Sequence, residues 1–317
     1  MRQNNHRLNA KKSMSLSIND SEHVVKRMVF QSKMKDYSEF LKLRLASLVV
    51  LSSAICYGVA VSEFSLPILA ALIIGGTLLT GASNGFNEII ERDLDALMDR
   101  TKNRPLPTSK MSVIEAWILA SLFGVLGIGI LGYFINPMCG ILGFIALVLY
   151  TIVYTPMKRK TPFAVFVGAF PGSIPAMLGV VAATKGFGEI TLLAWLMFAV
   201  QFIWQFPHFW AIAWRVNDDY LKAGFKMLPS AGGRDRASAF QILIYTIGLI
   251  PVSLLPMFFG YTGIFSVIIA IGAGLIFAWQ ALKLYRSLSS EDAKKLMFGS
   301  FVYLPVVQLA YLIDTLL

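Results

Sequence analysis

The chain has few charged residues for its length, and this scarcity sets its class. Only 15% of its 317 residues are Asp, Glu, Lys or Arg, whereas 56% are hydrophobic and the mean hydropathy is +0.65. Soluble globular domains carry about 25% charged residues. The composition therefore excludes an ordinary soluble protein and indicates an integral membrane protein.

Cysteine and histidine are also scarce, which limits the metal chemistry that the chain can support. The two cysteines, Cys56 and Cys139, fall within hydrophobic runs and give no disulfide framework. Of the three histidines, only His208 lies in the body of the chain. A zinc-type cluster of Cys and His ligands is therefore not expected.

Long hydrophobic runs are what the sequence has in place of charge. A membrane-spanning helix needs about 20 such residues, whereas a transmembrane strand alternates apolar and polar residues over about ten. The runs here are continuous, so we predict an all-α fold with nine transmembrane helices. The predicted spans are residues 43–63, 66–88, 112–133, 137–155, 163–184, 188–214, 237–259, 263–285 and 296–316.

Lys and Arg are distributed unequally between the predicted loops. If the N-terminus is cytoplasmic, all of the 28 Lys and Arg residues except Lys185 fall in cytoplasmic segments. Because basic loops stay in the cytoplasm, we expect the N-terminus there and the C-terminus outside. This topology and the anionic lipids of the bilayer account for the net charge of +10, so no nucleic-acid partner is expected.

The sequence divides into a tail and one membrane domain. Residues 1–36 are polar, mixed in charge and without a sustained apolar period, which predicts a disordered cytoplasmic tail. Residues 37–317 form the nine-helix transmembrane domain. The tail lacks the short apolar core of a signal peptide, and its acidic residues disfavour an organelle-targeting peptide, so we expect a bacterial inner (plasma) membrane.

Two predicted cytoplasmic loops, after the second and the sixth span, are long and carry most of the acids of the domain. In the first, Asn87, Glu91, Asp95 and Asp99 recur every four residues and would share one helix face. Oxygen ligands on one face suit Mg²⁺. An ordinary charged helix end is the alternative, but polar groups at the end of a membrane span are costly, which favours a functional site.

Basic side chains accompany the acids. They would neutralise the charge of a diphosphate held through the metal, although a plainer interpretation is anchoring by positive loops. The predicted diphosphate-binding residues are Arg100, Lys102, Arg104, Lys158 and Arg159. Glu88 and Asp93 fall off the acidic stripe, so we interpret them as solvated or pairing residues.

The second long loop follows the aromatic segment WQFPHFWAIAW and carries Asp218 and Asp219. Trp204 and His208 are one helical turn apart, so the aromatic cluster is either an interfacial belt or the wall of a pocket for a flat hydrophobic substrate. His208 could orient that substrate, act as a base, or pack as a core residue. The predicted pocket residues are Tyr154, Trp204, His208 and Trp210.

Taken together, NEIIERDLDALMDRTKNRPLP, YTPMKRKTP and the segment from WQFPHFW to DDYLKAGFKMLP resemble the intramembrane aromatic prenyltransferase (UbiA-type) superfamily over about residues 37–316. Within it, RTKNRPLP combined with PHFWAIAW and DDY resembles the haem-modifying branch. The catalytic residues that the resemblance implies are Asn87, Glu91, Asp95, Asp218 and Asp219.

The sequence departs from the pattern of that superfamily at three places. Glu91 stands where Asp is usual, which lengthens the side chain by one methylene. Asp218 and Asp219 are adjacent, whereas the family pattern has two Asp residues four apart. Lys42-Leu43-Arg44 stands where K-P-R is usual.

The resemblance implies transfer of a farnesyl group from farnesyl diphosphate to a vinyl group of haem b, with addition of water, giving haem O and diphosphate. It implies Mg²⁺ as cofactor, a cavity opening at the cytoplasmic side, and haem A synthase or cytochrome oxidase assembly factors as downstream partners. Prenylation of a quinone precursor or chlorophyllide is the nearest alternative. A polytopic transporter and a non-catalytic haem-binding assembly protein are the others, but transporters usually carry coupling acids near the bilayer midplane.

Overall fold

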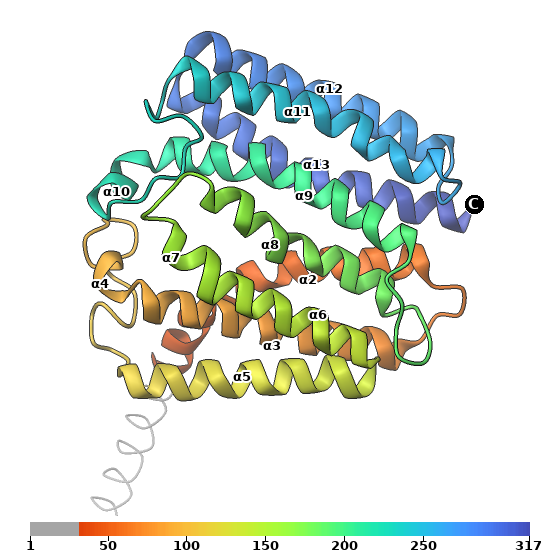
Figure 1. The fold of residues 1–317 in the computed structure, drawn as a ribbon, viewed down its shortest axis with the longest axis horizontal. Coiled ribbons are helices and arrows are strands. Elements are labelled where there is room, and N and C mark those ends of the chain that lie inside the picture. The colour runs from red at the N-terminus through yellow and green to blue at the C-terminus, as the bar shows by residue number, and fades with distance from the viewer. Residues whose placement is uncertain (1–31) are drawn as a thin grey trace, which may run out of the picture.

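The computed structural model describes residues 32–317, in which every regular element is a helix (Figure 1). The predicted tail lies outside the described residues as far as residue 31, and residues 32–41 are helical. In chain order the elements are α2 (Leu43–Ala60), α3 (Leu66–Ile90), α4 (Arg92–Asp95), α5 (Val113–Phe134), α6 (Pro137–Val148), η1 (Leu149–Tyr154), α7 (Thr155–Met157), α8 (Ala164–Val181), α9 (Leu192–Arg215), α10 (Asn217–Lys222), α11 (Arg236–Phe258), α12 (Ile264–Ser287) and α13 (Ser290–Leu316).

Nine helices in the described part of the chain are long and apolar enough to cross a membrane, with α6, η1 and α7 forming one of them. Each overlaps one predicted span, so the all-α fold with nine candidate spans is confirmed. The largest shift in a boundary is at α13, which begins at Ser290 and not at residue 296. The Ser289 side chain accepts a hydrogen bond from Asp292 N, and this N-cap extends the helix through a charged first turn.

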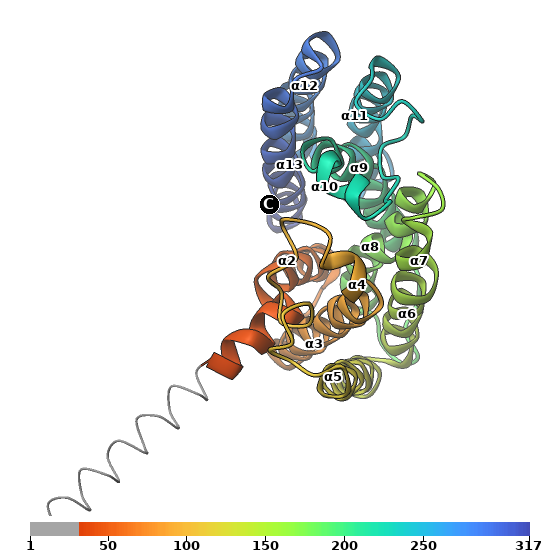
Figure 2. The same ribbon diagram turned by 90° about the vertical axis from the view of Figure 1, so that its left-hand side faces the viewer.

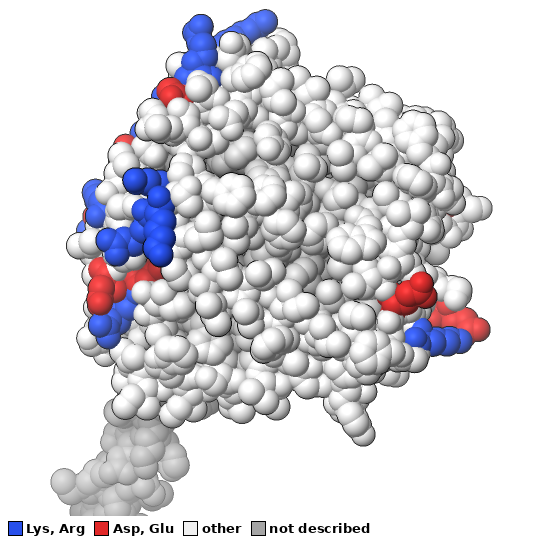
Figure 3. All heavy atoms as spheres, in the orientation of Figure 1, with Lys and Arg blue, Asp and Glu red and all other residues white. Residues whose placement is uncertain are grey.

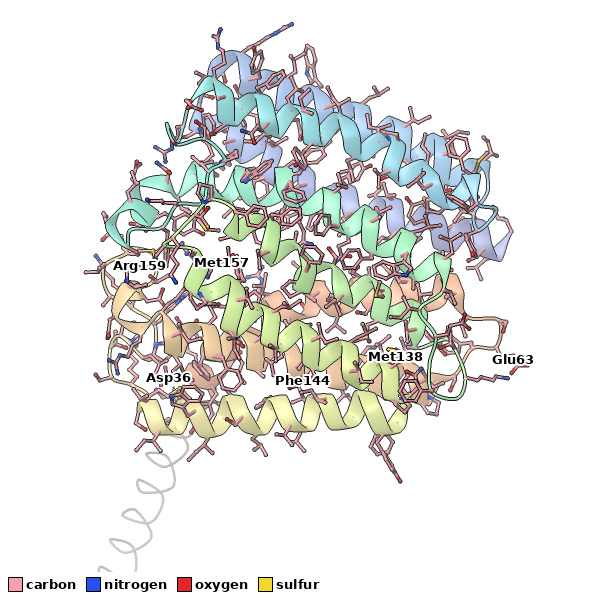
Figure 4. The ribbon with its side chains drawn as sticks, viewed as in Figure 1. Asp36, Glu63, Met138, Phe144, Met157 and Arg159 are labelled. Atoms are coloured by element: carbon pink, nitrogen blue, oxygen red, sulfur yellow. The ribbon has the colours of Figure 1, made fainter. Side chains whose placement is uncertain are left out.

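Charged side chains gather at the two ends of the molecule and leave an uncharged belt between them (Figure 3). The short helices α4 and α10 lie at one end, and the C-terminus lies at the other (Figure 1). Asp36 and Arg159 are at the α4/α10 end, whereas Glu63 is at the opposite end (Figure 4). This distribution is the one expected for a bundle that spans a bilayer.

Small residues bring α3, which ends in the acidic motif, close to α5, and α5 close to α6. A Cβ atom added at Gly127 of α5 would lie 2.8 Å from the backbone nitrogen of Leu79 in α3. A Cβ at Gly140 of α6 would lie 2.9 Å from Gly132 Cα in α5. Membrane helices associate through such close contacts between small residues. The helix that ends in the acidic motif is thus held against α5 along its length.

The fourth span contains a π-helical segment, η1, near its α4/α10 end. The backbone N–H of Thr155 donates to the carbonyl of Tyr150, five residues earlier, and Thr155 Oγ1 donates to the same carbonyl at 2.8 Å. π-Helical turns are rare and are frequent at functional sites. Here the segment ends at Tyr154, and the short helix α7 leads from it to Lys158, one of the predicted diphosphate-binding residues.

Candidate functional site

The acidic motif lies where the second span ends. Helix α3 ends at Ile90, Glu91 has a bridging conformation (φ −94°, ψ 6°), and α4 begins at Arg92. Backbone bonds from Glu91 N to Asn87 O and from Asp95 N to Glu91 O keep the four-residue spacing across this break. Asn87, Glu91 and Asp95 are accordingly all buried, with exposed fractions of 4%, 4% and 1%.

Asp99 does not continue this buried stripe, because turns follow α4 and end its helical spacing. Its side chain is 63% exposed and pairs with Lys102 at 2.6 Å and with Lys222. The hydrogen bonds from Lys102 and Lys222 lower the pKa of Asp99 to about 2. The structure therefore groups three of the four predicted metal ligands and leaves Asp99 at the surface.

Three cations lie against the buried carboxylates. Lys158 Nζ is 2.9 Å from Glu91, and Arg104 binds Asp95 Oδ2 at 2.6 Å. Arg104 Nε is also 3.4 Å from Glu88, whose other partner is Lys42 Nζ at 3.1 Å. We refer to these six side chains and Asn87 as the buried charged cluster; they are Lys42, Glu88, Glu91, Asp95, Arg104 and Lys158.

Glu88 and Lys42 are members of this cluster that sequence reasoning did not include. Glu88 is 1% exposed, so of the two interpretations given for it, pairing is confirmed and solvation is wrong. The signal that could have identified Lys42 was the Lys42-Leu43-Arg44 motif before α2. Burial lowers the pKa of Lys42 to about 8, although the charge of Glu88 acts to raise it.

Lys158 is held in the cluster from two further sides. Its ammonium group lies over the Tyr154 ring, 4.8 Å from the centroid, and its carbonyl accepts a bond from Lys226 N at 2.8 Å. Burial acts to lower the pKa of Lys158, but the charge of Glu91, its hydrogen bond to Lys158, and Tyr150 and Tyr220 together outweigh burial and raise the pKa above its ordinary value. Lys158 is therefore a fixed positive charge.

Oxygen atoms in the cluster are left free to bind a ligand. Asp95 Oδ1 and Glu88 Oε2 are buried and accept no hydrogen bond within residues 32–317. Asn87 Nδ2 donates to Thr155 Oγ1 at 3.2 Å, which leaves Asn87 Oδ1 for another partner. In the same described range no three His, Cys, Asp or Glu side chains are arranged to bind a metal ion by themselves. The residues fit Mg²⁺, which usually takes one or two carboxylates and completes its shell with water and phosphate oxygens.

The two adjacent acids of the second loop have different environments. Asp219 accepts hydrogen bonds from the backbone N–H groups of Asp99 and Arg100, at 3.1 and 3.0 Å. Asp218 is 77% exposed and pairs with Arg234, away from the cluster. Burial acts to raise the pKa of Asp219, but the two backbone bonds and Lys222 together outweigh it, and the pKa is lowered. Asp219 therefore joins α10 to the turn after α4, and Figure 2 shows both short helices at the end of the molecule that faces the viewer.

The five predicted diphosphate-binding residues also divide into members of the buried charged cluster and exposed residues. Arg104 and Lys158 belong to the buried charged cluster, whereas Arg100, Lys102 and Arg159 are exposed at the α4/α10 end. Figure 4 shows Arg159 at this end of the bundle. The structure thus gives an inner pair and an outer group of basic side chains.

An apolar cavity of about 350 Å³ lies between α2, α3, α6, η1, α8, α9 and α13. Asn84 and Tyr150 on the cavity wall lie close to the buried charged cluster. Asn84 is one turn before Glu88, and the Tyr150 ring lies 5.2 Å from that of Tyr154, which Lys158 covers. The cavity and the charged cluster are therefore adjoining parts of one site.

Two of the four predicted pocket residues line this cavity, namely Trp204 and His208. Tyr154 contributes through its contacts with Tyr150 and Lys158, without being part of the wall. Trp210 packs against Phe206 and Tyr245, with ring centroids 5.4 and 5.1 Å away, and is not on the cavity wall. Its place on α9 directs it to the opposite side from His208.

A buried charged cluster beside an apolar cavity can hold a molecule with a polyanionic head and an apolar tail. Isoprenoid diphosphates have this form. The fold and the site therefore define a membrane-embedded prenyltransferase. The chain belongs to the UbiA prenyltransferase family, whose sequence model matches residues 48–304. Membership identifies it as an enzyme and not as a transporter.

Curated relatives share close to half of their residues with this chain. A protein of Christiangramia forsetii named protoheme IX farnesyltransferase is 48% identical over 290 residues, which are 89% of this chain and 94% of the relative. A protein of Flavobacterium psychrophilum with the same name is 47% identical over 295 residues, 90% of this chain and 96% of the relative.

Solved structures share the fold at low sequence identity. A UbiA homolog from Archaeoglobus fulgidus, described as bound to GPP and Mg²⁺, has a TM-score of 0.69 and 16% identity, covering 87% of this chain and 99% of that one. An apo UbiA homolog from Aeropyrum pernix has a TM-score of 0.68 and 20% identity, covering 85% and 98%. These likenesses support the architecture described above.

Proposed function

We propose that this protein transfers the farnesyl group of farnesyl diphosphate to a vinyl group of protohaem IX, with addition of water, giving haem O and diphosphate. The observation that carries the proposal is the buried charged cluster adjoining an apolar cavity, in a chain 48% identical to a protein named protoheme IX farnesyltransferase. Prenylation of a quinone precursor or chlorophyllide would use the same cluster and differ in the occupant of the cavity.

The reaction requires a carbon–oxygen bond to break with charge separation. The C1–O bond of farnesyl diphosphate breaks, and its electron pair leaves with the diphosphate. The allylic carbon bonds to the terminal vinyl carbon of the haem, and water adds its oxygen to the other vinyl carbon and releases a proton. The protein must therefore stabilise a developing polyanion and exclude water from the allylic carbon until the bond has formed.

Arg104 and Lys158 are placed to stabilise the departing diphosphate. Lys158 is buried and the Arg104 side chain is 14% exposed. Each already lies against a carboxylate, so each would bridge between that carboxylate and phosphate oxygens without a large movement. Mg²⁺, when bound, would supply further neutralisation, and Asn87 Oδ1, Glu91 and Asp95 Oδ1 are the oxygen atoms available to hold it. The exposed Arg100, Lys102 and Arg159 would attract the diphosphate at the surface.

The cavity wall would surround the farnesyl chain and the macrocycle. Aromatic faces such as that of Trp204 can stabilise an allylic cation, and apolar residues exclude water from it. The distribution of Lys and Arg supports an orientation in which the α4/α10 end faces the cytoplasm, and the cavity would open on that side. We assign the protein to a bacterial inner membrane, where haem A synthase or an oxidase assembly factor would receive the product.

The activity of the enzyme is expected to fall as the pH rises through about 8, because the pKa of Lys42 is lowered to that value. Loss of the Lys42 proton leaves Glu88 with one counterion fewer and weakens the positive charge of the cluster. Lys42→Arg keeps its charge at alkaline pH, so its activity should persist to higher pH. Initial rates of both proteins across the neutral-to-alkaline range test this, and identical profiles would contradict it.

Asp219→Asn is expected to lower activity by roughly tenfold and Asp218→Asn by less, because of these two acids only Asp219 bonds to the loop after α4. The effect of Asp219→Asn should appear mainly as a raised KM for the prenyl diphosphate. Steady-state kinetics of both variants make the comparison. A larger loss in Asp218→Asn would show that the second acidic region acts through Asp218.

The proposal is tested with the purified protein in liposomes, supplied with farnesyl diphosphate and one of three acceptors. These acceptors are haem b, a quinone precursor and chlorophyllide. Farnesylated haem should form, and the other acceptors should remain unchanged. Prenylation of the quinone precursor in place of haem would assign the protein to another branch of the family. Omitting Mg²⁺ from the same assay should abolish the product.

A further inference from the structure

His208 differs from the other polar groups on the cavity wall. Ser52 donates to Gln201 Oε1 at 2.6 Å, Gln201 Nε2 donates to the Gly172 carbonyl at 2.8 Å, and Gln205 Nε2 donates to the Ala169 carbonyl at 2.9 Å. These groups bind one another or the backbone. His208 is 7% exposed and also lines the cavity, but only one of its ring nitrogens has a partner among residues 32–317.

The hydrogen bonds around His208 define which nitrogen carries the proton. His208 Nδ1 lies 2.7 Å from Ser300 Oγ, and Ser300 Oγ donates its single proton to the Met297 carbonyl at 2.6 Å. Because a hydroxyl group has one proton, Ser300 must accept from His208, so the proton of the neutral ring is on Nδ1. The lone pair of Nε2 is then directed away from Ser300 and is available in the cavity.

Aromatic neighbours fix the plane of the His208 ring. Trp204 stacks on it, with centroids 4.4 Å apart and planes 16° apart, and the Trp204 indole N–H donates to the Ser300 carbonyl at 2.9 Å. Phe301 and Phe209 meet the ring edge-on, with centroids 5.0 and 5.3 Å away. The ring cannot rotate without losing these contacts, so the Nε2 lone pair has a fixed direction.

A neutral imidazole whose Nδ1–H is bound to an oxygen and whose Nε2 is free is the form in which histidine binds metal ions. Because the acceptor proposed above is a flat macrocycle with iron at its centre, and resting on that proposed function, we infer that His208 Nε2 is an axial ligand of the iron of the haem substrate. Ser300 is the positioning residue that holds the ligand nitrogen toward the iron. Coordination would fix the macrocycle in the cavity, and thereby the distance of its vinyl groups from the buried charged cluster.

The test is the resonance Raman spectrum of ferrous haem b bound to the purified full-length protein. An iron–histidine stretching band is expected, and it should shift when the protein is labelled with ¹⁵N-histidine. The band should be lost in His208→Ala and return when imidazole is added to that variant. The double variant His6→Ala/His23→Ala, which removes the other two histidines of the chain, should keep the band.

Two further measurements separate ligation from packing. His208→Ala should lose affinity for haem b while keeping affinity for metal-free protoporphyrin IX, which has the same shape without the iron; loss of both would show that His208 only packs. Ser300→Ala should keep the band but move it to lower frequency, because the hydrogen bond to Nδ1 makes the imidazole a stronger donor. A merely structural role for Ser300 would leave the frequency unchanged.

The outcomes for ligation and for the proposed function can be distinguished. If the wild-type protein makes haem O but shows no iron–histidine band, or if the band persists in His208→Ala, the ligation is wrong and the farnesyl transfer stands. If the wild-type protein makes no haem O yet shows the band, the site binds haem as inferred and the proposed reaction is wrong. His208→Gln gives a second variant that must also lack the band.

Discussion

Asp95→Ala is expected to reduce haem farnesylation by at least about 1,000-fold, at any Mg²⁺ concentration. Asp95 is 1% exposed, binds Arg104 through Oδ2 and keeps Oδ1 free of hydrogen bonds. Its removal takes away an oxygen available to the metal and also the group that holds Arg104 toward the diphosphate. A loss of that size corresponds to about 4 kcal/mol of transition-state stabilisation.

Asp93→Ala is the matched control for this prediction. Asp93 is two residues away on the same short helix, but its side chain is 83% exposed, and within residues 32–317 its ion pair is with its neighbour Arg92. Its variant should retain activity close to that of the wild-type protein. Steady-state rates of haem O formation in liposomes, over a range of Mg²⁺ concentrations, compare the two. An active Asp95→Ala protein, or rescue by excess Mg²⁺, would remove Asp95 from the reaction.

Lys158→Gln is expected to lower kcat by about 100-fold or more, because Lys158 supplies a fixed, buried positive charge where the diphosphate departs. The substitution also leaves Glu91 buried without its cation, which costs about 3–5 kcal/mol of stability. The double variant Lys158→Gln/Glu91→Gln removes both charges. It should regain thermal stability and remain inactive, which separates the role in catalysis from the role in folding.

Lys160→Gln is the matched control for Lys158→Gln. Lys160 is a basic residue in the same segment, but it is exposed and lies outside the cluster. We expect its activity and stability to be near those of the wild-type protein. Thermal unfolding in detergent and single-turnover rates are the measurements. Recovery of activity in the double variant would mean that Lys158 only compensates the charge of Glu91.

Sequence reasoning gave the nine helices because each contains a run of about 20 apolar residues, a signal that needs no tertiary context. It could not predict that the helix is interrupted at Glu91, because the interruption between α3 and α4 is a single residue long. The turns after α4 explain why Asp99 lies at the surface although it has the same spacing as Asp95.

The partners in the buried charged cluster could not be read from spacing along one helix. Glu88 is about 100° around α3 from Asn87, so a single-face argument excludes it. It is buried because Lys42, before α2, and Arg104, in the loop after α4, approach from other parts of the chain. These contacts join segments that are distant in the sequence, so they depend on how the helices pack.

The aromatic residues show the same limit. Trp204 and His208 were predicted to share a face and do so, since they are one helical turn apart. Trp210 was grouped with them by composition alone, and its position on α9 turns it toward Phe206 and Tyr245. The rotation of α9 about its axis decides which aromatic side chain faces the cavity. A helix with apolar residues on all sides does not specify that rotation in its sequence.

The most direct test of the account is the mass of the haem extracted after the purified protein in liposomes has reacted with farnesyl diphosphate and haem b in ¹⁸O-labelled water. The account predicts a haem heavier by one farnesyl group and one hydroxyl group, with the ¹⁸O label in that new hydroxyl group. Unchanged haem b from a folded, Mg²⁺-supplied protein would contradict it.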